Sequence, residues 1–160
     1  MRMSIVAVGR LKSGPERDLF ERYLSRLEGL GRSVGIGSAK LVEITESRAG
    51  SAAVRKSEEA GSIIGKCADT ALLVALDERG KALTSRSLAS TIGEWRDSGV
   101  HEICFAIGGA DGHGDAVRSA ARLTLSLGKL TLPHGLARIV LIEQLYRSAT
   151  ILAGHPYHRE

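Results

Sequence analysis

Aromatic residues are scarce in this chain, at 4% of 160 positions, and cysteine is scarcer still, with two residues. So few rings argue against an aromatic platform on which single-stranded bases stack. The two cysteines, Cys67 and Cys104, each lie in an apolar stretch, so we expect buried, reduced thiols in a cytoplasmic protein rather than a disulfide scaffold. No apolar run approaches the roughly 18 residues of a membrane-spanning helix, and the first residues lack the pattern of a signal peptide.

The overall balance is that of a soluble globular protein, with 43% hydrophobic and 25% charged residues. A chain of 160 residues predicts one domain, residues 1–160, with a core large enough to need no metal staple. The net charge of +4 permits a polyanionic partner without requiring one.

Apolar runs and helical periodicities alternate along the chain. They predict strands at 4–8, 40–44, 70–76, 102–107 and 123–127. A first helix is expected to begin at a capping box formed by Ser13 and Glu16. Further helices are expected over 52–67, 84–97, 115–121 and 136–153, and a turn at 77–80. This alternation predicts an α/β fold, a parallel-rich sheet with helices on both faces. Ligands then bind outside the carboxyl ends of strands, which marks the loops after Leu76, Ile107 and Leu127.

Two of these loops have a composition suited to a ligand. Gly108, Gly109 and Gly112 can cradle a phosphate or nucleoside, although their spacing is neither the dinucleotide fingerprint nor a P-loop, and an ordinary tight turn explains them equally well. We expect a side chain at Gly108 to block the backbone's approach to a ligand. The segment 126–135 is apolar yet interrupted by glycine and proline. It is either a buried connection or the lining of an apolar cleft that holds an adenine and a small charged tail.

The helix at 136–153 is apolar around most of its circumference, so it must be buried on more than one side. A subunit interface would supply the second side, which predicts a homodimer with an obligate interface of about 2,000 Å² or more. Arg138 lies within the apolar arc, where pairing across an interface is commoner than catalysis. His155 and His158 in the tail have poor spacing for zinc, and the tail is either a frayed end or a dock for phosphates and a base.

Several motifs together resemble the ribosomal RNA large subunit methyltransferase H family, a compact group of SPOUT methyltransferases. They are the opening strand 5–9, the strand end Leu76-Asp77, the segments 105–109 and 130–134, the run 143–147 and, most specifically, the ending 155–160. Departures are Ala110-Asp111, where Pro-Glu is common in the family, and Gly135, where a larger polar residue is usual.

The resemblance implies a C-terminal trefoil knot, a homodimer, and S-adenosylmethionine bound in the knot loops. It places cofactor contacts at Leu76, Gly108, Leu127, Gly128, Lys129, Leu130, Thr131 and Leu132. The implied reaction methylates N3 of a pseudouridine in helix 69 of the large-subunit (23S) rRNA, on assembled ribosomes, in the cytoplasm and without a metal or a membrane. The nitrogen N3 must lose its proton for the methyl transfer. We expect the tail to place the RNA or to accept this proton, through His155, Tyr157, His158 and Arg159, and His134 is a further candidate base.

Two alternatives to this reading stay open. A non-catalytic ribosome-associated RNA-binding protein could use the same fold. The segment pattern by itself also fits a flavodoxin-like binder of nucleotides or phosphate.

Overall fold

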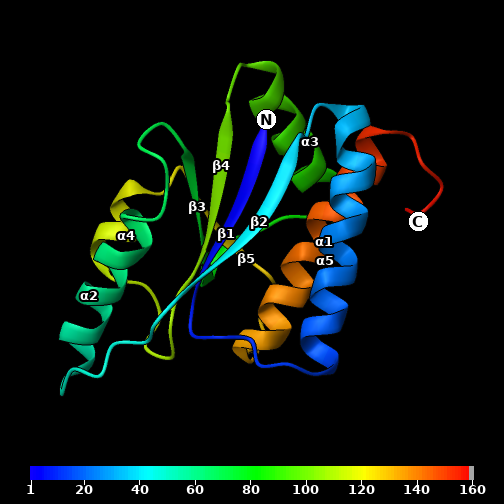
Figure 1. The fold of residues 1–160 in the computed structure, drawn as a ribbon. Helices are drawn as coiled ribbons and strands as arrows, with labels where there is room; N and C mark the ends of the chain where they lie inside the picture. The colour runs from blue at the N-terminus through cyan, green and yellow to red at the C-terminus, as the bar shows by residue number, and fades with distance from the viewer. Residues whose placement is uncertain (159–160) are drawn as a thin grey trace.

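A five-stranded sheet forms the centre of the computed structural model, which describes residues 1–158 (Figure 1). All strand pairs are parallel, in the order β2-β1-β4-β3-β5. The strands are β1 Arg2–Val8, β2 Ser38–Ile44, β3 Leu72–Ala82, β4 Glu102–Ile107 and β5 Leu123–Ser126. The helices are α1 Pro15–Gly31, the 3-10 turn η1 Arg32–Val34, α2 Ala52–Ile64, α3 Ser85–Asp97, α4 Asp115–Ala120 and α5 His134–Leu152. The predicted α/β class is confirmed.

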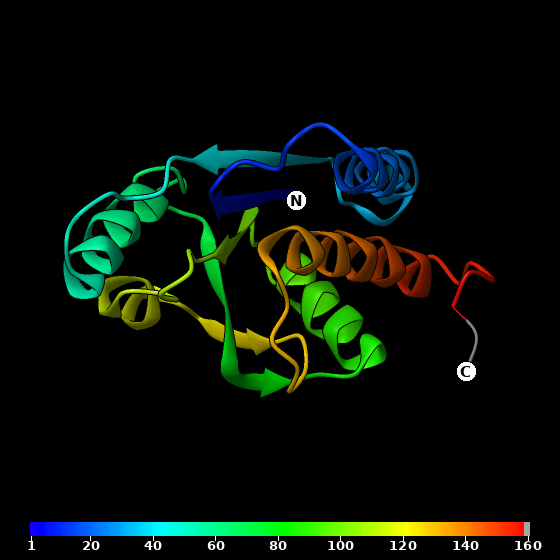
Figure 2. The ribbon, with the colours of Figure 1, turned by 90° about the horizontal axis from the view of Figure 1, so that it is seen from below.

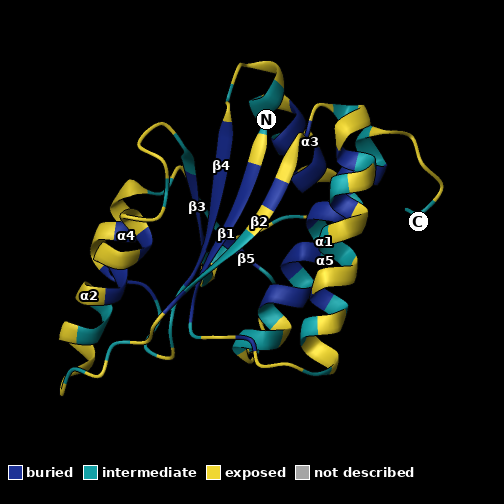
Figure 3. Ribbon diagram, in the orientation of Figure 1, coloured by how far each residue is buried: buried dark blue, intermediate teal, exposed yellow. Residues whose placement is uncertain are grey.

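Helices cover both faces of the sheet, as Figure 2 shows in a view from below. Helices α2 and α4 pack together on one face, and α1, α3 and α5 share the other. All six residues of β4 are buried, as expected for the apolar run 103–107 when both faces of the sheet are covered, and the first residue, Glu102, is paired with Arg2. Buried residues, dark blue in Figure 3, lie along the central strands and along α5.

Helix α5 lies between α1 and α3 and also contacts β4. Leu141, Ile142, Leu145 and Ala149 are fully buried in this one chain. Packing within the chain therefore covers most of the apolar circumference of the helix, but Leu136 is 42% exposed and Val140, Ile151 and Leu152 are only partly buried. The homodimer stays a prediction.

Arg138 pairs inside the chain rather than across an interface, which corrects the expectation from the sequence. Its guanidinium is 1% exposed and donates to Glu43 Oε1 at 3.1 Å and to the carbonyls of Val8 and Gly9 at 2.7 and 2.8 Å. Burial lowers the pKa of Arg138, and Glu43 partly offsets that effect. The pair joins α5 to the ends of β1 and β2.

Three local predictions also need correction. Helix α1 has Pro15 in its first turn as expected, but Gly14 is its N-cap and no side chain caps it, so the Ser13–Glu16 capping box does not form. The segment 77–80 interrupts the pairing of β3 with β5 without ending the strand, which continues to Ala82. Cys67 and Cys104 form a disulfide, with their Cα atoms 6.1 Å apart, instead of remaining reduced.

Among the described residues, no helix is long and apolar enough to cross a membrane.

Candidate functional site

A cavity of about 620 Å³ opens at the carboxyl ends of β3, β4 and β5. The three loops marked from the sequence build it, together with the first turn of α5. The volume lies within the range of pockets that hold small molecules and cofactors. The parallel sheet explains the location, because the carboxyl ends of neighbouring strands meet at one edge.

The part of β3 that does not pair with β5 supplies the charged wall of the cavity. Asp77, Glu78 and Arg79 lie between the two stretches of β3 that pair with β5. Gly80 lets the strands approach, because a Cβ there would lie 2.7 Å from the Thr124 backbone. Asp77 accepts hydrogen bonds from the Arg118 guanidinium at 3.2 and 3.3 Å. Burial opposes ionisation of Asp77, but bonds from Arg79 and Arg118 outweigh it and lower its pKa.

The glycine loop after β4 folds back on itself through an isolated bridge between Gly109 and Gly112, and Gly112 has a φ of 79°. A Cβ on Gly108 would lie 3.0 Å from the Gly112 carbonyl carbon and 3.2 Å from the His113 nitrogen. A side chain at Gly108 would thus strain the loop before it touched a ligand. That differs from the expectation that it would simply block the ligand's approach.

Helix α2 holds this loop from behind. Arg55 donates to both carboxylate oxygens of Asp111, at 2.7 and 3.2 Å. Glu59 is 6% exposed and accepts from the Ser47 backbone at 3.0 Å, and a Cβ on Gly109 would lie 2.6 Å from its other carboxylate oxygen. Gly109 therefore allows the buried carboxylate to lie against the loop.

The third wall is the irregular segment between β5 and α5. Ser126 Oγ accepts from the Gly128 backbone at 3.2 Å, and Gly128 has a φ of 129°, so the chain turns sharply after the strand. Leu130 is 82% exposed. Pro133 is the N-cap of α5, and His134, its first residue, lines the cavity.

The structure brings most of the predicted cofactor residues together. Leu76, Gly108, Leu127, Gly128, Leu130, Thr131 and Leu132 line the cavity, and Lys129 does not. The charged side chains of the cavity wall, above all Asp77, Asp111 and Arg118, were not predicted from the sequence as site residues. The position of Asp77 directly after the buried strand was a usable signal, but its pairing with Arg118 depends on a contact across 41 residues.

His113 lies under the glycine loop and is also a residue that sequence reasoning overlooked. The side chain is 2% exposed, and neither ring nitrogen has a hydrogen-bond partner among the described residues. Burial lowers the pKa of His113, although the carboxylate of Asp77 opposes the effect. The ring is therefore neutral at pH 7.

The tail residues lie far from this cavity in the same chain. The cavity adjoins His134 and Ala137 at the start of α5, whereas the tail follows the end of that helix. A helix of 19 residues is about 28 Å long. The described part of the tail, drawn in red in Figure 2, lies at the end of α5 that points away from the sheet. His155, Tyr157 and His158 are thus not brought to the cavity, and Arg159 lies outside the described residues.

Tyr157 fastens the tail to α5. Its hydroxyl donates to Glu143 Oε1 at 3.1 Å and lies 3.4 Å from the Tyr23 hydroxyl, and its ring packs on Tyr146 with centroids 4.8 Å apart. Burial and the hydrogen bonds with Tyr23 and Glu143 raise the pKa of Tyr157. Arg147 lies over the ring, 4.9 Å from its centroid. Tyr157 and His158 therefore pack against α5, while residues 153–156 between them and the helix are exposed.

His155 and His158 have separate partners. His155 Nδ1 accepts from the Tyr157 backbone at 3.2 Å, and His158 Nδ1 lies 3.5 Å from the Arg147 guanidinium. Within residues 1–158, no group of three or more His, Cys, Asp or Glu side chains is placed to hold a metal ion.

Comparison with known proteins gives consistent matches over the whole chain. Residues 1–158 match the family model described as "Predicted SPOUT methyltransferase". Proteins named "Ribosomal RNA large subunit methyltransferase H" from Sinorhizobium fredii and Agrobacterium fabrum are each 55% identical over 159 residues, 99% of this chain and of theirs. A solved SpoU methyltransferase, AviRb from Streptomyces viridochromogenes in complex with AdoMet, covers 92% of this chain and 59% of its own, with 12% identity and a TM-score of 0.38.

Proposed function

The chain belongs to the SPOUT methyltransferases, in the ribosomal RNA large subunit methyltransferase H family, and we propose that it methylates N3 of a pseudouridine in helix 69 of the 23S rRNA. The methyl donor is S-adenosylmethionine and the substrate is the assembled ribosome, which makes the enzyme cytoplasmic. Membership also implies the C-terminal trefoil knot, which the order of elements along the chain does not reveal. The observation that carries the proposal is the cavity built from the three loops.

The chemistry of the cavity walls suits this donor. Leu76, Leu127 and Leu132 offer apolar surface to an adenine, and the glycine loop offers backbone close to the ligand. Asp77, Asp111 and Arg118 add charged groups to the walls, although Asp77 is paired with Arg118 and Asp111 with Arg55, so the charged tail of the donor would have to compete with these pairs. The donor supplies a methyl group on a sulfonium, so the attacking nitrogen needs a lone pair in line with the methyl–sulfur bond.

The N3 proton of the base must leave before or during the transfer, to a side chain or to water. Tyr157 is excluded as the acceptor because its raised pKa keeps the hydroxyl protonated near pH 7. The hydroxyl is instead a donor that holds the tail in place. The remaining candidate acceptors are His134 at the cavity, and His155 and His158 in the tail. Positioning alone contributes as much as ~7–11 kcal/mol in favourable systems.

A second copy of the chain is needed if the tail acts on a base held at the cavity, because the two lie at opposite ends of α5. The exposed Leu130 and Leu136 flank the cavity, at 82% and 42% exposure, and offer apolar surface to a partner. We therefore propose a homodimer in which each cavity faces the partner's tail.

Methyl transfer from labelled S-adenosylmethionine tests the activity. Assembled ribosomes, isolated large subunits and protein-free 23S rRNA are compared, and nucleoside mass spectrometry locates the methyl group. We expect incorporation only into assembled ribosomes, at a single pseudouridine. Ribosome binding without incorporation would favour the non-catalytic alternative. Affinity for flavin mononucleotide and none for S-adenosylmethionine in calorimetry would favour a flavodoxin-like binder.

Mixing two inactive variants tests the composite site. Ala137→Leu fills the cavity and leaves the tail intact, whereas Arg159→Ala does the reverse. In heterodimers formed by random exchange one of the two sites is intact, so an equimolar mixture should recover about a quarter of wild-type activity. A mixture as inactive as its components, with exchange verified by mass spectrometry, would mean that each site is built from one chain.

A further inference from the structure

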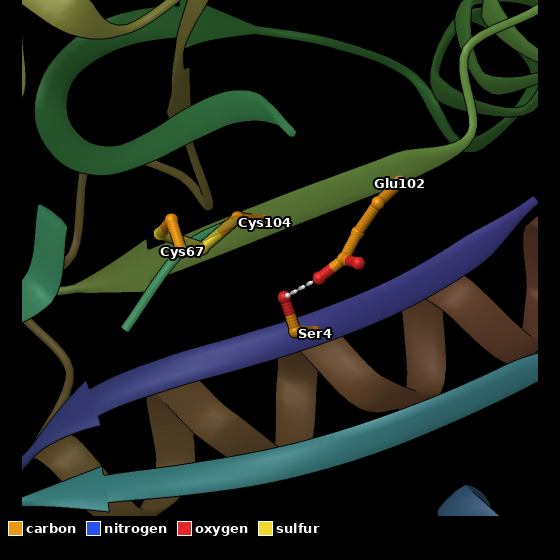
Figure 4. Close-up of a disulfide and its surroundings, with 4 residues drawn as sticks. All are labelled: Ser4, Cys67, Glu102 and Cys104. Carbon is orange, nitrogen blue, oxygen red and sulfur yellow. Dashed lines mark hydrogen bonds between the residues drawn. A yellow bond between two sulfur atoms is a disulfide. The ribbon is translucent and has the colours of Figure 1, made fainter. Parts of the chain in front are cut away.

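The disulfide lies at the edge of the sheet opposite the large cavity. Cys104 is on β4, and Cys67 follows α2 (Figure 4). A second cavity of about 380 Å³ opens there, at the amino ends of β1, β2 and β4. It is lined by Arg2, Met3, Ser38, Lys40, Lys66, Cys67, Ala68 and Glu102.

The two sulfurs differ in access. Cys104 is 0% exposed and lies inside the cluster packed between the sheet and α2, whereas Cys67 is half-buried and lines the small cavity. An incoming nucleophile therefore reaches Cys67 from the cavity and cannot reach Cys104.

The cavity is also positively charged. Glu102 is the one carboxylate among the lining residues. It forms an ion pair with Arg2 at 3.0 Å and accepts a hydrogen bond from the Ser4 hydroxyl at 3.2 Å, and Figure 4 shows the bond from Ser4. Lys40 and Lys66 have no ion-pair partner within residues 1–158, and both are exposed at the cavity wall. An anion entering the cavity meets two unpaired ammonium groups beside the accessible sulfur.

We propose that Cys67–Cys104 is a reversible disulfide and that small anionic thiols, of the class of tripeptides with a free thiol and two carboxylates, exchange with it at Cys67. The thiolate attacks Cys67 Sγ, a mixed disulfide forms, and the Cys67–Cys104 bond breaks with its electron pair on Cys104, which then takes a proton. A second thiolate attacks the mixed disulfide, releases Cys67 as a thiol, and leaves the small thiol as its own disulfide. The protein gains two electrons and two protons, and two small thiols are oxidised.

Disulfides in a cytoplasmic protein are typically transient or redox-sensing, and the asymmetry of access fits exchange better than a structural cross-link. The proposal is independent of the methyltransferase reaction, because the small cavity and the large one share no lining residue.

The rate of reduction by thiols of different charge tests the proposal. Oxidised protein is treated with glutathione, neutral 2-mercaptoethanol or cationic cysteamine at low ionic strength, and free thiols are counted by alkylation and mass spectrometry. We expect Lys40→Met and Lys66→Met each to slow reduction by glutathione roughly fivefold, relative to 2-mercaptoethanol. The effect should shrink as salt is added. Lys12→Met, an exposed lysine outside the cavity, is the matched control and should change nothing.

Single-cysteine variants test which sulfur reacts. With oxidised glutathione, Cys104→Ala should gain one glutathione on Cys67, and Cys67→Ala should gain none, with circular dichroism verifying that both are folded. The proposal fails if the wild type never forms the disulfide under oxidising conditions. It also fails if Cys104 is the residue that takes up glutathione, or if the lysine variants reduce at wild-type rates with every thiol.

Discussion

Replacing Arg138 should destabilise each chain rather than separate two subunits. The guanidinium is 1% exposed and makes three hydrogen bonds, to Glu43 and to the carbonyls of Val8 and Gly9. Removing one member of a buried pair costs about 3–5 kcal/mol, because the other charge loses its compensation. Glu43 keeps bonds from Arg17 at 3.1 Å and from the Leu11 backbone at 2.6 Å, so we expect the lower end, about 3 kcal/mol, for Arg138→Met.

Arg17 is the matched control, since it pairs with the same carboxylate but has a side chain 32% exposed. Arg17→Met should cost about 1 kcal/mol or less, as partly exposed pairs do. The double variant Arg138→Met with Glu43→Gln should be less unstable than the sum of the two single variants, because the stranded carboxylate is then absent.

Urea unfolding at several protein concentrations gives the measurement. The reasoning would be refuted if Arg138→Met unfolded within about 0.5 kcal/mol of wild type, or if its loss of stability disappeared at high protein concentration. The second result would return Arg138 to a subunit interface.

Three further predictions follow from the site. Ala137→Leu should abolish S-adenosylmethionine binding in calorimetry without unfolding the protein, whereas Ala116→Leu, an exposed alanine of α4 away from the cavity, should bind normally. Arg159→Ala should leave cofactor affinity near wild type and depress ribosome methylation roughly ten- to a hundredfold, through loss of one charge-assisted contact, and reduced cofactor affinity would contradict this. His113 has a lowered pKa in the folded state, so below about pH 6.5 the unfolded chain binds a proton that the folded chain does not, and stability falls as pH falls. His113→Gln should flatten the dependence of the urea midpoint between pH 5 and 7, and an unchanged slope would show that this histidine does not contribute.

Much of the fold was predictable because its elements carry local signals. The run at 103–107 is apolar and, together with the ion-paired Glu102, forms the fully buried β4. Thr84, at the predicted start of the helix over 84–97, caps α3 by accepting from the Ser87 backbone at 3.1 Å. The three loops were found because parallel strands put their carboxyl ends at one edge. The roles of the residues in those loops remain predictions.

Three of the errors share a physical origin, since each depended on contacts between residues distant in sequence, whereas the capping box at Ser13 and Glu16 failed locally. The Asp77–Gly80 segment has the composition of a turn, but Gly80 lets β5 approach closely enough for β3 to resume. The cysteine pair joins residues 37 apart, and nothing local distinguishes it from two buried thiols. Arg138 on an apolar helix face indicated a partner but not its location, and the partner is Glu43, 95 residues away.

The homodimer prediction started from the apolar circumference of α5 and gains a second basis from the length of the same helix. Helices α1 and α3 and the sheet cover most of the apolar circumference of α5, which leaves Leu136 and the partly buried Val140 as the apolar surface that a second subunit would cover. The length of the same helix does separate the cavity at His134 from the tail after Leu152 by about 28 Å. Tyr157 binds Glu143 and Tyr23, so the tail is held at its own end of the helix and does not fold back toward its own cavity. Any mechanism that joins cofactor loops and tail on one pseudouridine therefore needs two chains, which the mixing experiment tests directly.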